Sequence, residues 1–466
     1  MQDQIQRLHG HIDSSFEDHL QRTREFVRQP SISGDGTGIK EMAQLVAGEV
    51  ERLGGQAEIV PTPGHPVVTG EVDAGAPRTL LVYGMYDVQP VTGETWTTEP
   101  FGAEIIELPG LGRSLLNRGI TNQKGPLIGF FCAMQSLLAT AGSLPVNLKF
   151  LIEGEEELGS PSLPGVVERQ RDALAADAAF FPAFSQDPDG KVVMYLGAKG
   201  TVHFEVTARG GDWGGPTSRG IHGSNAAWFH SPAWALVQAL AGMLTVDQRR
   251  IAVRGIYDDV APPSEEDEQL LARLSETLTL DTYLRQNDVR RFKHPEQGAD
   301  LLRRFLFEPG LNLNGIASGY VGPGTKTVVP HEARARVDIR LVPRMQPETV
   351  FSLMLEHLSQ SEYHVETELL HAYTWSKSSL SDLANSVLLD TYRSLGFEPE
   401  VWPLIAGSAP FYLFTQTLGI PVAMGGLGHG GRQHSPDEYA TVDGLRLFEK
   451  SVAEYVLRFG ARTEVT

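Results

Sequence analysis

One short run, residues 79–83 (TLLVY), constrains the fold of this chain most, because a strand that is apolar at nearly every position is buried on both faces of a sheet. An apolar helix with Pro126 in its first turn follows at 125–141, and a second strand follows at 146–152. A buried strand, a buried helix and another strand in succession predict a layered α/β domain.

A different pattern begins later in the chain. The segment RARVDIRLVP (334–343) alternates strictly between charged and apolar residues up to Leu341. Strict alternation is typical of an antiparallel strand with one face in the core and the other face in solvent. We therefore predict a second, α+β domain at residues 201–375, inserted into an outer α/β domain that comprises residues 1–200 and 376–466.

The size and charge of the chain limit the kinds of partner that we expect it to bind. It has 466 residues, with 39 Lys+Arg against 58 Asp+Glu and a formal net charge of −19. A chain this acidic repels phosphate backbones and anionic lipid surfaces, so neither nucleic acid nor a membrane is an expected partner. The N-terminus lacks the apolar core of a signal peptide, and the lone Cys132 sits in an apolar run and forms no intrachain disulfide. We expect a cytoplasmic protein.

The densest acidic feature is the segment EGEEELGS, which directly follows the strand at 146–152 and carries Glu153, Glu155, Glu156 and Glu157. Loops at the carboxyl ends of strands are where α/β folds place their sites. Crowded carboxylates raise the pKa values of one another, which suits a general acid or base near neutral pH, and they also bind cations. A solvated acidic loop is the alternative interpretation.

Three further segments place polar residues at the ends of buried elements: GMYDVQP (84–90), NRGITNQKGP (117–126) and GRQHSPDE (431–438). Together with EGEEELGS, and in this order, they resemble the M20 family of dinuclear zinc peptidases, in its branch of carnosinase-like dipeptidases. The family pattern is GHxDVxP, RGxxDxKG, EGxEExGS, a lone Asp before YGxRG, and HSPxE. The resemblance implies a zinc-peptidase-like α/β catalytic domain with an inserted ferredoxin-like lid that forms homodimers.

The chain departs from that pattern at the metal ligands. Met85 stands where the family has its first metal-binding His, Asn122 stands in place of the bridging Asp, and Ala183 falls at the Asp before YGxRG. Glu157 and His434 alone match the five expected ligands. A thioether and a neutral carboxamide are poor ligands for zinc, so we expect neither a metal pair nor another cofactor. Zinc held weakly by Glu157 and His434 is the alternative.

Other positions of the family's catalytic machinery are retained. The resemblance places Glu156 at the general base and Asp87 beside the ligand position, and it implies that the lid residue His222 reaches across a dimer to the substrate. Asn122 and His434 would then position the substrate. Glu155 is expected to face solvent.

Recognition of the substrate is expected to involve the lid. Thr327, Arg340 and Ser408 match positions that hold the carboxylate end of the substrate in the dipeptidases. Leu404 stands where the family has an Arg just before Ser408, so recognition at that end is expected to differ from that of the family.

Three functions remain open. The first is an enzyme that works without the two metals on a small substrate derived from an amino acid or peptide, with Glu156 as general acid or base in acyl transfer, cyclisation, amide formation or hydrolysis of an activated bond. The second is a metal-dependent dipeptidase or amidase with an altered site. The third is a non-catalytic binding relative. We favour the first, because Glu156 is retained while three ligand positions are lost.

Overall fold

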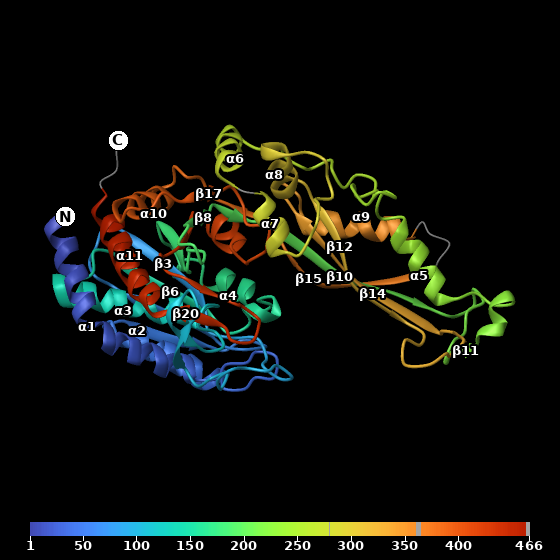
Figure 1. Cartoon of the computed structure of the whole chain (residues 1–466), viewed down its shortest axis with the longest axis horizontal. Helices are drawn as coiled ribbons and strands as arrows, with labels where there is room; N and C mark the ends of the chain where they lie inside the picture. The colour runs from blue at the N-terminus through green and yellow to red at the C-terminus, as the bar shows by residue number, and fades with distance from the viewer. Residues whose placement is uncertain (279, 360–364, 463–466) are drawn as a thin grey trace. The chain divides into compact units, whose positions relative to one another are not determined.

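The computed structural model describes residues 1–278, 280–359 and 365–462, and the chain divides into two compact units (Figure 1). Unit 1 comprises Met1–Leu196, Ser378–Trp402 and Leu413–Thr466, and unit 2 comprises Gly197–Lys377 and Pro403–Tyr412. The predicted boundaries, 200/201 and 375/376, lie within a few residues of these. The segment 403–412, which the prediction keeps in the outer domain, groups with unit 2 instead.

Unit 1 is built on a mixed sheet of six strands in the order β1-β2-β6-β3-β7-β18. These strands are β1 (Gln56–Val60), β2 (Val67–Val72), β6 (Asn147–Glu153), β3 (Thr79–Met85), β7 (Ala178–Pro182) and β18 (Val422–Gly425). Strands β6, β3, β7 and β18 run parallel to one another, and β1 and β2 are antiparallel to their neighbours. The helices are α1 (Gln2–Arg28), α2 (Ile39–Arg52), α3 (Lys124–Ala141), α4 (Leu163–Arg169), α10 (Leu383–Ser394) and α11 (Val442–Ala461).

The sequence explains how these layers pack. Strand β3 is buried from Leu80 onward, as its apolar run predicts, and α3 is buried on nearly all sides because it contacts both α1 and α11. Helix α2 covers β1 and β2, while α10 contacts β7 and β18. Figure 1 shows these helices flanking the sheet. The layered α/β domain is therefore confirmed.

Smaller elements complete unit 1. An antiparallel sheet has the order β19-β20-β5-β4 and contains β19 (Gly430–Gly431), β20 (Tyr439–Thr441), β5 (Gly112–Leu116) and β4 (Glu104–Leu108). Strands β8 (Val193–Tyr195) and β17 (Glu400–Trp402) form a parallel pair, and the short helices are η1 (Glu156–Leu158) and η3 (Leu413–Leu418). The small sheet holds the end of β5 beside the start of β20, so the segment that follows β5 lies close to the segment that precedes β20.

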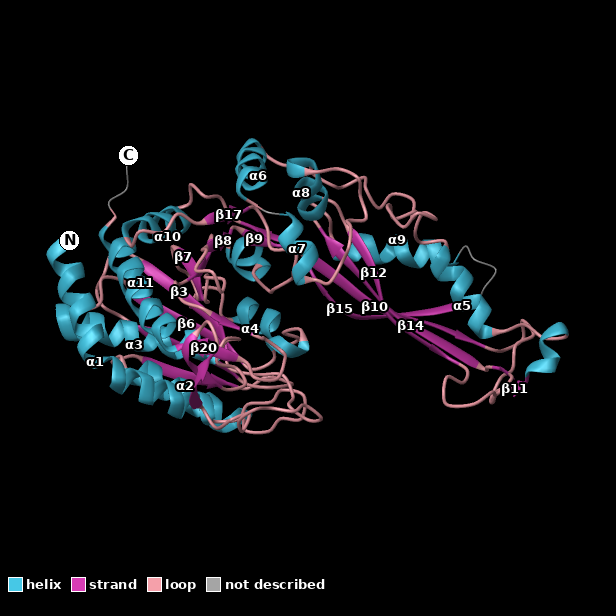
Figure 2. Cartoon of the chain, viewed as in Figure 1, coloured by secondary structure: helices cyan, strands magenta, loops and turns pink. Residues whose placement is uncertain are grey.

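Unit 2 is a four-stranded antiparallel sheet with helices on one face (Figure 2). Its strands, in the order β12-β14-β10-β15, are β12 (Gly310–Ser318), β14 (Glu332–Leu341), β10 (Gly200–Arg209) and β15 (Val365–Tyr373). Helices α5 (Pro232–Ala241) and α9 (Pro347–Ser359) pack on this sheet. The chain order β10-α5-β12-β14-α9-β15 is that of a ferredoxin-like fold, which confirms the predicted class of the inserted domain.

The alternation of β14 is visible in its packing. Val337 and Ile339 belong to the core beneath α5 and α9, and Arg334 and Arg336 lie on the opposite face, where both pair with Glu205. The remaining elements of unit 2 are α6 (Glu265–Thr277), α7 (Leu280–Gln286), α8 (Gly298–Phe307), η2 (Gly223–Ala227), β9 (Gly197–Ala198), β11 (Ile221–His222), β13 (Val328–Val329) and β16 (Ser376–Lys377). Within the described ranges, no helix has the length and apolar character needed to cross a membrane.

Candidate active site

The predicted site lies at the carboxyl ends of β3, β6 and β7. Strands β6 and β7 flank β3 on either side and run parallel to it, with Met85 opposite Glu153 in the register. Because parallel strands end at the same edge of a sheet, the segments after these three strands emerge together. The backbone N–H of Tyr86 donates a hydrogen bond to the carbonyl of Glu153 at 2.8 Å, which ties two of these segments to each other.

Asp87 fixes the backbone of the acidic segment. Its side chain is fully buried, and its two carboxyl oxygens accept hydrogen bonds from the backbone N–H groups of Glu156, at 3.2 Å, and Glu157, at 3.1 Å. Burial, together with the charge of Glu157, raises the pKa of Asp87 to about 7, against hydrogen bonds that lower it. Asp87 thus places both glutamates and does not contact a metal-binding His.

Glu156 is the side chain best suited to proton transfer. It is half-buried in η1, and no described residue donates a hydrogen bond to its carboxyl group. Burial raises the pKa of Glu156 well above its usual value, and the charges of Glu157, Glu153 and Asp87 add to this effect. A carboxyl group of this kind can hold a proton near neutral pH and give it to a reacting atom.

The Glu155 side chain is more buried than the sequence predicts. It is 4% exposed, and its Oε1 accepts a hydrogen bond from the backbone N–H of His65 at 2.9 Å. The prediction that Glu155 faces solvent is therefore wrong, because the loop around Gly64 covers it. The sequence shows three adjacent glutamates, and only the path of this distant loop distinguishes Glu155 from Glu156.

Glu157, Asn122 and His434 form one cluster of hydrogen bonds. The Asn122 Nδ2 donates to Glu157 Oε1 at 2.8 Å and lies 3.0 Å from His434 Nε2, and His434 Nε2 lies 2.9 Å from the same Glu157 oxygen. The hydrogen bond with Glu157 raises the pKa of His434. Gln89, which sequence reasoning missed although it lies within GMYDVQP, donates from Nε2 to Glu157 Oε2 at 2.8 Å. The carboxylate of Glu157 is thus satisfied by side-chain amides.

The three lost ligand positions also lie at this edge of the sheet. Met85 ends β3 with a buried thioether, and Ala183 follows β7 with only a methyl group. Gln123 links the two strands, since its Oε1 accepts from the backbone N–H of Met85 at 2.8 Å and its Nε2 donates to the carbonyl of Pro182 at 2.6 Å. These side chains supply hydrogen bonds and apolar contacts where charged ligands would be needed.

The donor set does not fit a pair of zinc ions. Two such ions need a bridging anion and several anionic or imidazole ligands, whereas Glu157 and His434 already bond to each other and to Asn122. Among the described residues, one group of three potential ligands lies within metal-binding distance, namely His19, Cys132 and Glu449, and it is buried where α1, α3 and α11 meet.

A buried ion pair positions Asn122. The carboxyl group of Glu438 accepts hydrogen bonds from the backbone N–H groups of Gly119, Thr121 and Asn122, each at 2.9 Å, and pairs with Arg118 at 3.2 Å. Arg118 and Glu438 are both 1% exposed. They belong to motifs that the sequence singles out, yet sequence reasoning did not select them. Their role in holding the Asn122 loop appears only from the contact between distant segments.

Glu153 should make the stability of the protein depend on pH. Its Oε1 accepts hydrogen bonds from the hydroxyls of Tyr83 and Ser160, and its Oε2 is buried with no hydrogen-bond partner in the described part of the chain. Burial raises the pKa of Glu153 to about 8. Because the folded state binds this proton more tightly than the unfolded state, the stabilisation is complete below the unfolded pKa, about 4.5, and is lost as the pH rises towards 8.

We therefore expect Tm to fall from pH 5 to pH 8, and to fall less in Glu153→Gln, whose amide does not titrate while its oxygen still accepts both hydroxyls. Differential scanning fluorimetry across this range measures the effect. Glu41→Gln, at an exposed position of α2, is the matched control and should keep the wild-type slope. Equal slopes for wild type and Glu153→Gln would contradict this assignment.

The lid candidates form two separate pairs within unit 2. Arg340 Nη1 donates to Ser408 Oγ at 2.8 Å, whereas Thr327 Oγ1 lies 3.4 Å from His222 Nε2. His222 and Thr327 adjoin β11 and β13, which precede β14, and Arg340 lies near the far end of β14. Nine residues of extended strand thus separate the pairs, roughly 25 to 30 Å. One copy of unit 2 does not bring all four residues together.

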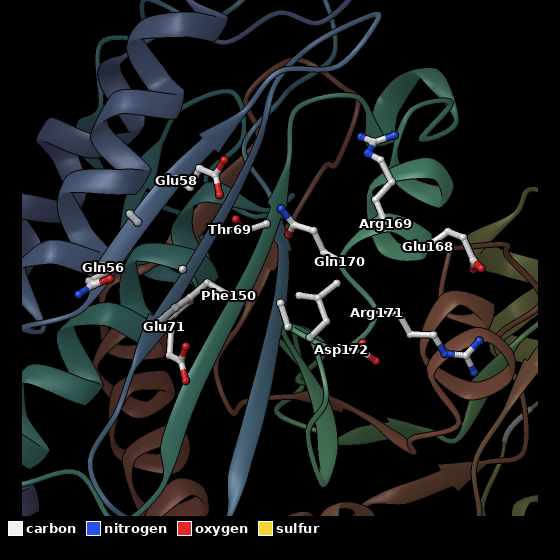
Figure 3. Close-up of a pocket in the computed structure, with 14 residues that line it drawn as sticks. Gln56, Glu58, Thr69, Glu71, Phe150, Glu168, Arg169, Gln170, Arg171 and Asp172 are labelled. Atoms are coloured by element: carbon white, nitrogen blue, oxygen red, sulfur yellow. The ribbon is translucent and has the colours of Figure 1, made fainter.

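The groove in Figure 3 lies elsewhere in unit 1. Its volume is about 550 Å³, and it is lined by residues of β1 and β2 and by the segment 168–174, with Glu58 and Glu71 among its acids and Arg169 and Arg171 among its bases. The groove contains none of the predicted site residues, so it does not belong to the site described above.

The fold and the site are those of a peptidase-like hydrolase with an inserted lid. Residues 81–458 match the model of peptidase family M20/M25/M40, and the chain belongs to this family. It is 30% identical over 379 residues to a Beta-Ala-His dipeptidase of Rattus norvegicus, covering 76% of this chain and 73% of the relative. It is 29% identical over 476 residues to a Cys-Gly metallodipeptidase of Schizosaccharomyces pombe, covering 95% and 97%.

The solved structures agree with this assignment. An M20 family metallo-carboxypeptidase from Sulfolobus solfataricus superposes with a TM-score of 0.88 at 31% identity, covering 95% of this chain and 99% of that one. The resemblance to the M20 family and its carnosinase-like branch is therefore confirmed, as is the class of enzyme, a hydrolase.

Proposed function

We propose that this chain is an M20-family enzyme that acts on a small substrate derived from an amino acid or peptide without two metal ions, with Glu156 as the proton-transfer group. One observation carries the proposal. The Glu156 carboxyl has no hydrogen-bond donor among the described residues and a raised pKa, beside a cluster in which amides take the place of metal ligands.

The reaction class follows from what the site offers. Glu156 gives or takes a proton, while Asn122 and His434 hold or polarise the substrate through hydrogen bonds. An unactivated peptide bond is hard to hydrolyse by these means alone. Acyl transfer, cyclisation, amide formation and hydrolysis of an activated bond depend more on positioning and proton movement, and they suit this site better.

A metal-dependent dipeptidase is the second candidate, and the name of the S. pombe relative, a metallodipeptidase, favours it. The residues at the ligand positions, Met85, Asn122 and Ala183, argue against a metal-dependent enzyme because they supply no charged ligand. The third candidate is a binding relative without turnover, and the retained Glu156 argues against that candidate. We place the reaction in the cytoplasm, in keeping with the single buried Cys132.

Metal analysis tests the proposal directly. Protein purified without added metal should contain well under one equivalent of zinc or manganese, because too few ligands remain in the site. EDTA should leave both turnover and Tm unchanged. Elemental analysis that finds close to two metals per chain, lost in His434→Ala but retained in Cys132→Ser, would establish the metallopeptidase instead.

We further propose that the chain forms a homodimer through the lid. Unit 2 exposes large apolar side chains on and just before α5, with Trp228 80% and Trp234 68% exposed. Exposed apolar patches of this kind mark sites of association. A twofold dimer also gives the separated His222–Thr327 pair a role, since each copy can supply it to the site of its partner.

Light scattering should therefore report a mass of about twice 50.9 kDa at micromolar concentration. Trp234→Arg places a charge in the proposed interface and should shift the population to monomer, with a loss of turnover as His222 leaves the partner's site. Leu45→Arg, at an exposed apolar position of α2 in unit 1, is the control and should remain dimeric. A monomeric wild type would refute the dimer.

A further inference from the structure

An open pocket of about 980 Å³ lies in unit 2 beside α6, α7 and α8, the helices labelled in Figure 2. Its walls come from the end of α6, from α7, from the segment 290–297 and the start of α8, and from the turn 247–249. None of the residues placed at the active site or in the two lid pairs lines it. We call it the α7 pocket. Its volume is at the upper end of the range for sites that hold small molecules.

The charged groups that line the α7 pocket are the cations Arg249, Arg290, Arg291 and Lys293 and the acids Asp247, Asp281 and Glu296. Two of these acids are already paired. Asp247 Oδ2 lies 3.8 Å from Arg249 Nε, and Glu296 Oε1 lies 2.8 Å from a guanidinium nitrogen of Arg304, which does not line the pocket. These pairs offset the charge of both acids.

The other cations of the α7 pocket have no such partner. In the described part of the chain, the side chains of Arg290, Arg291 and Lys293 make no ion pair and no hydrogen bond, and Asp281 is the one lining acid of which the same is true. Asp288 is exposed and does not line the pocket. Three unpaired cations are thus balanced by one unpaired acid, in a chain whose formal net charge is −19. The pocket has a local excess of positive charge.

His294 also lines the pocket. Burial lowers its pKa, and the charges of Arg304 and Lys293 lower it as well, against Glu296 and Glu308. The imidazole is therefore mostly neutral at pH 7, where it donates a hydrogen bond without adding charge.

The α7 pocket has an apolar part beside these cations. Leu284 of α7 and Phe292 are half-buried, and Leu301 of α8 is 7% exposed. Phe292 lies between Arg291 and Lys293 in the sequence. An aromatic ring offers a face on which a planar base stacks, and guanidinium groups bind phosphate oxygens in pairs. The pocket therefore suits a ligand that is apolar at one end and carries several negative charges at the other.

We propose that the α7 pocket binds a nucleoside polyphosphate, with Arg290, Arg291 and Lys293 at the phosphates and Phe292 and Leu284 at the base. A small polyanion is a better occupant than a nucleic acid or an acidic protein. The net negative charge of the chain repels a large polyanion over its whole surface, whereas a small ligand interacts mainly with charges within about 10 Å. This inference does not rest on the proposed function, because the pocket contains none of the residues that serve the reaction.

Calorimetry on the full chain tests the proposal with ATP in the absence of magnesium, with adenosine and with inorganic tripolyphosphate. ATP should bind with a Kd of roughly 10 to 100 µM, and more weakly when NaCl rises from about 50 to about 300 mM. Adenosine, which has no charge, should bind at least about tenfold more weakly than ATP. Tripolyphosphate, which has no base, should bind at least about threefold more weakly.

Variants assign the binding to the α7 pocket. The double variant Arg290→Gln, Arg291→Gln should weaken ATP binding at least about tenfold. The double variant Arg254→Gln, Arg344→Gln is the matched control, since it removes two exposed cations of unit 2 that do not line the pocket, and its affinity should stay within about twofold of wild type. Phe292→Ser should reduce the affinity for ATP to that for tripolyphosphate. Tm checks that each variant is folded.

Three results would overturn the inference: no binding of ATP at millimolar concentration, equal affinities of the wild type for ATP and tripolyphosphate, or an unchanged affinity in Arg290→Gln, Arg291→Gln. Tighter binding of a hexaglutamate peptide than of ATP would also overturn it, in favour of an acidic protein partner. Glu156→Gln should bind ATP as the wild type does. Binding of ATP by a protein without turnover would refute the proposed function and leave this inference intact.

Discussion

Glu156→Gln should lower turnover by roughly 10²-fold to 10⁴-fold while leaving the fold nearly unchanged. The amide has the shape of the carboxyl group but cannot give or accept the proton that the reaction moves. No described residue donates a hydrogen bond to the Glu156 carboxyl, so its replacement breaks no structural contact of that side chain. The measurement is kcat on the best substrate from a panel of dipeptides, aminoacyl amides and activated esters, with Tm as the check on folding.

Glu155→Gln is the matched control. Glu155 is adjacent in sequence and buried, and the amide oxygen of Gln can still accept the N–H of His65, so turnover should change little. Equal activity of Glu156→Gln and wild type would end the acid–base hypothesis. If Glu157→Gln and His434→Ala lose as much turnover as Glu156→Gln, and added zinc restores part of it, the result would instead support a metallopeptidase.

The second prediction concerns a variant that carries the metal ligands of the family pattern. The triple variant Met85→His, Asn122→Asp and Ala183→Asp should bind about two zinc ions per chain, whereas the wild type should bind well under one. With Glu157 and His434, the three changes provide the three carboxylates and two imidazoles of the family pattern. Asn122→Asp also replaces the amide that donates to Glu157 with a second anion, which a cation must offset.

Elemental analysis after dialysis, together with the rise of Tm on adding zinc, measures the outcome. Asn122→Asp alone is the control and should bind zinc weakly, because Met85 and Ala183 still supply no charged ligand. A further assay uses the dipeptides in the names of two relatives, Cys-Gly and Beta-Ala-His, but zinc binding alone decides the prediction. A triple variant that folds and binds no zinc would show that the lost ligands are not the cause of a metal-free site.

The sequence predicts much of the site because its motifs are local. Asp87, Glu156 and Glu157 follow directly on strands whose apolar runs mark them as buried, and parallel strands end at a common edge. The order of the motifs identifies the family, and membership of the family implies the inserted lid. Asn122 and His434 enter through the same motifs, and the structure places both against Glu157.

Other features could not be predicted because they depend on which distant loops meet. Glu155 and Glu156 look alike in the sequence, and only the loop near Gly64 buries the first against His65. Gln89 and Glu438 act through contacts with Glu157 and with the backbone of the Asn122 loop, 68 and more than 300 residues away. Spacing within a motif contains no information on such contacts.

By itself, the sequence determined the layered α/β domain, the inserted ferredoxin-like domain and the family. It also showed which residues stand at the expected ligand positions, namely Met85, Asn122 and Ala183. Apolar periodicity and residue identity are properties of the chain, so no structure is needed to recognise them. Only the tertiary structure decided that amides satisfy Glu157, that Asp87 supports the backbone of the two glutamates, and that residues 403–412 bring Ser408 to Arg340. The physical reason is that a hydrogen bond requires two groups to meet within about 3 Å, and packing between segments far apart in the chain sets that distance.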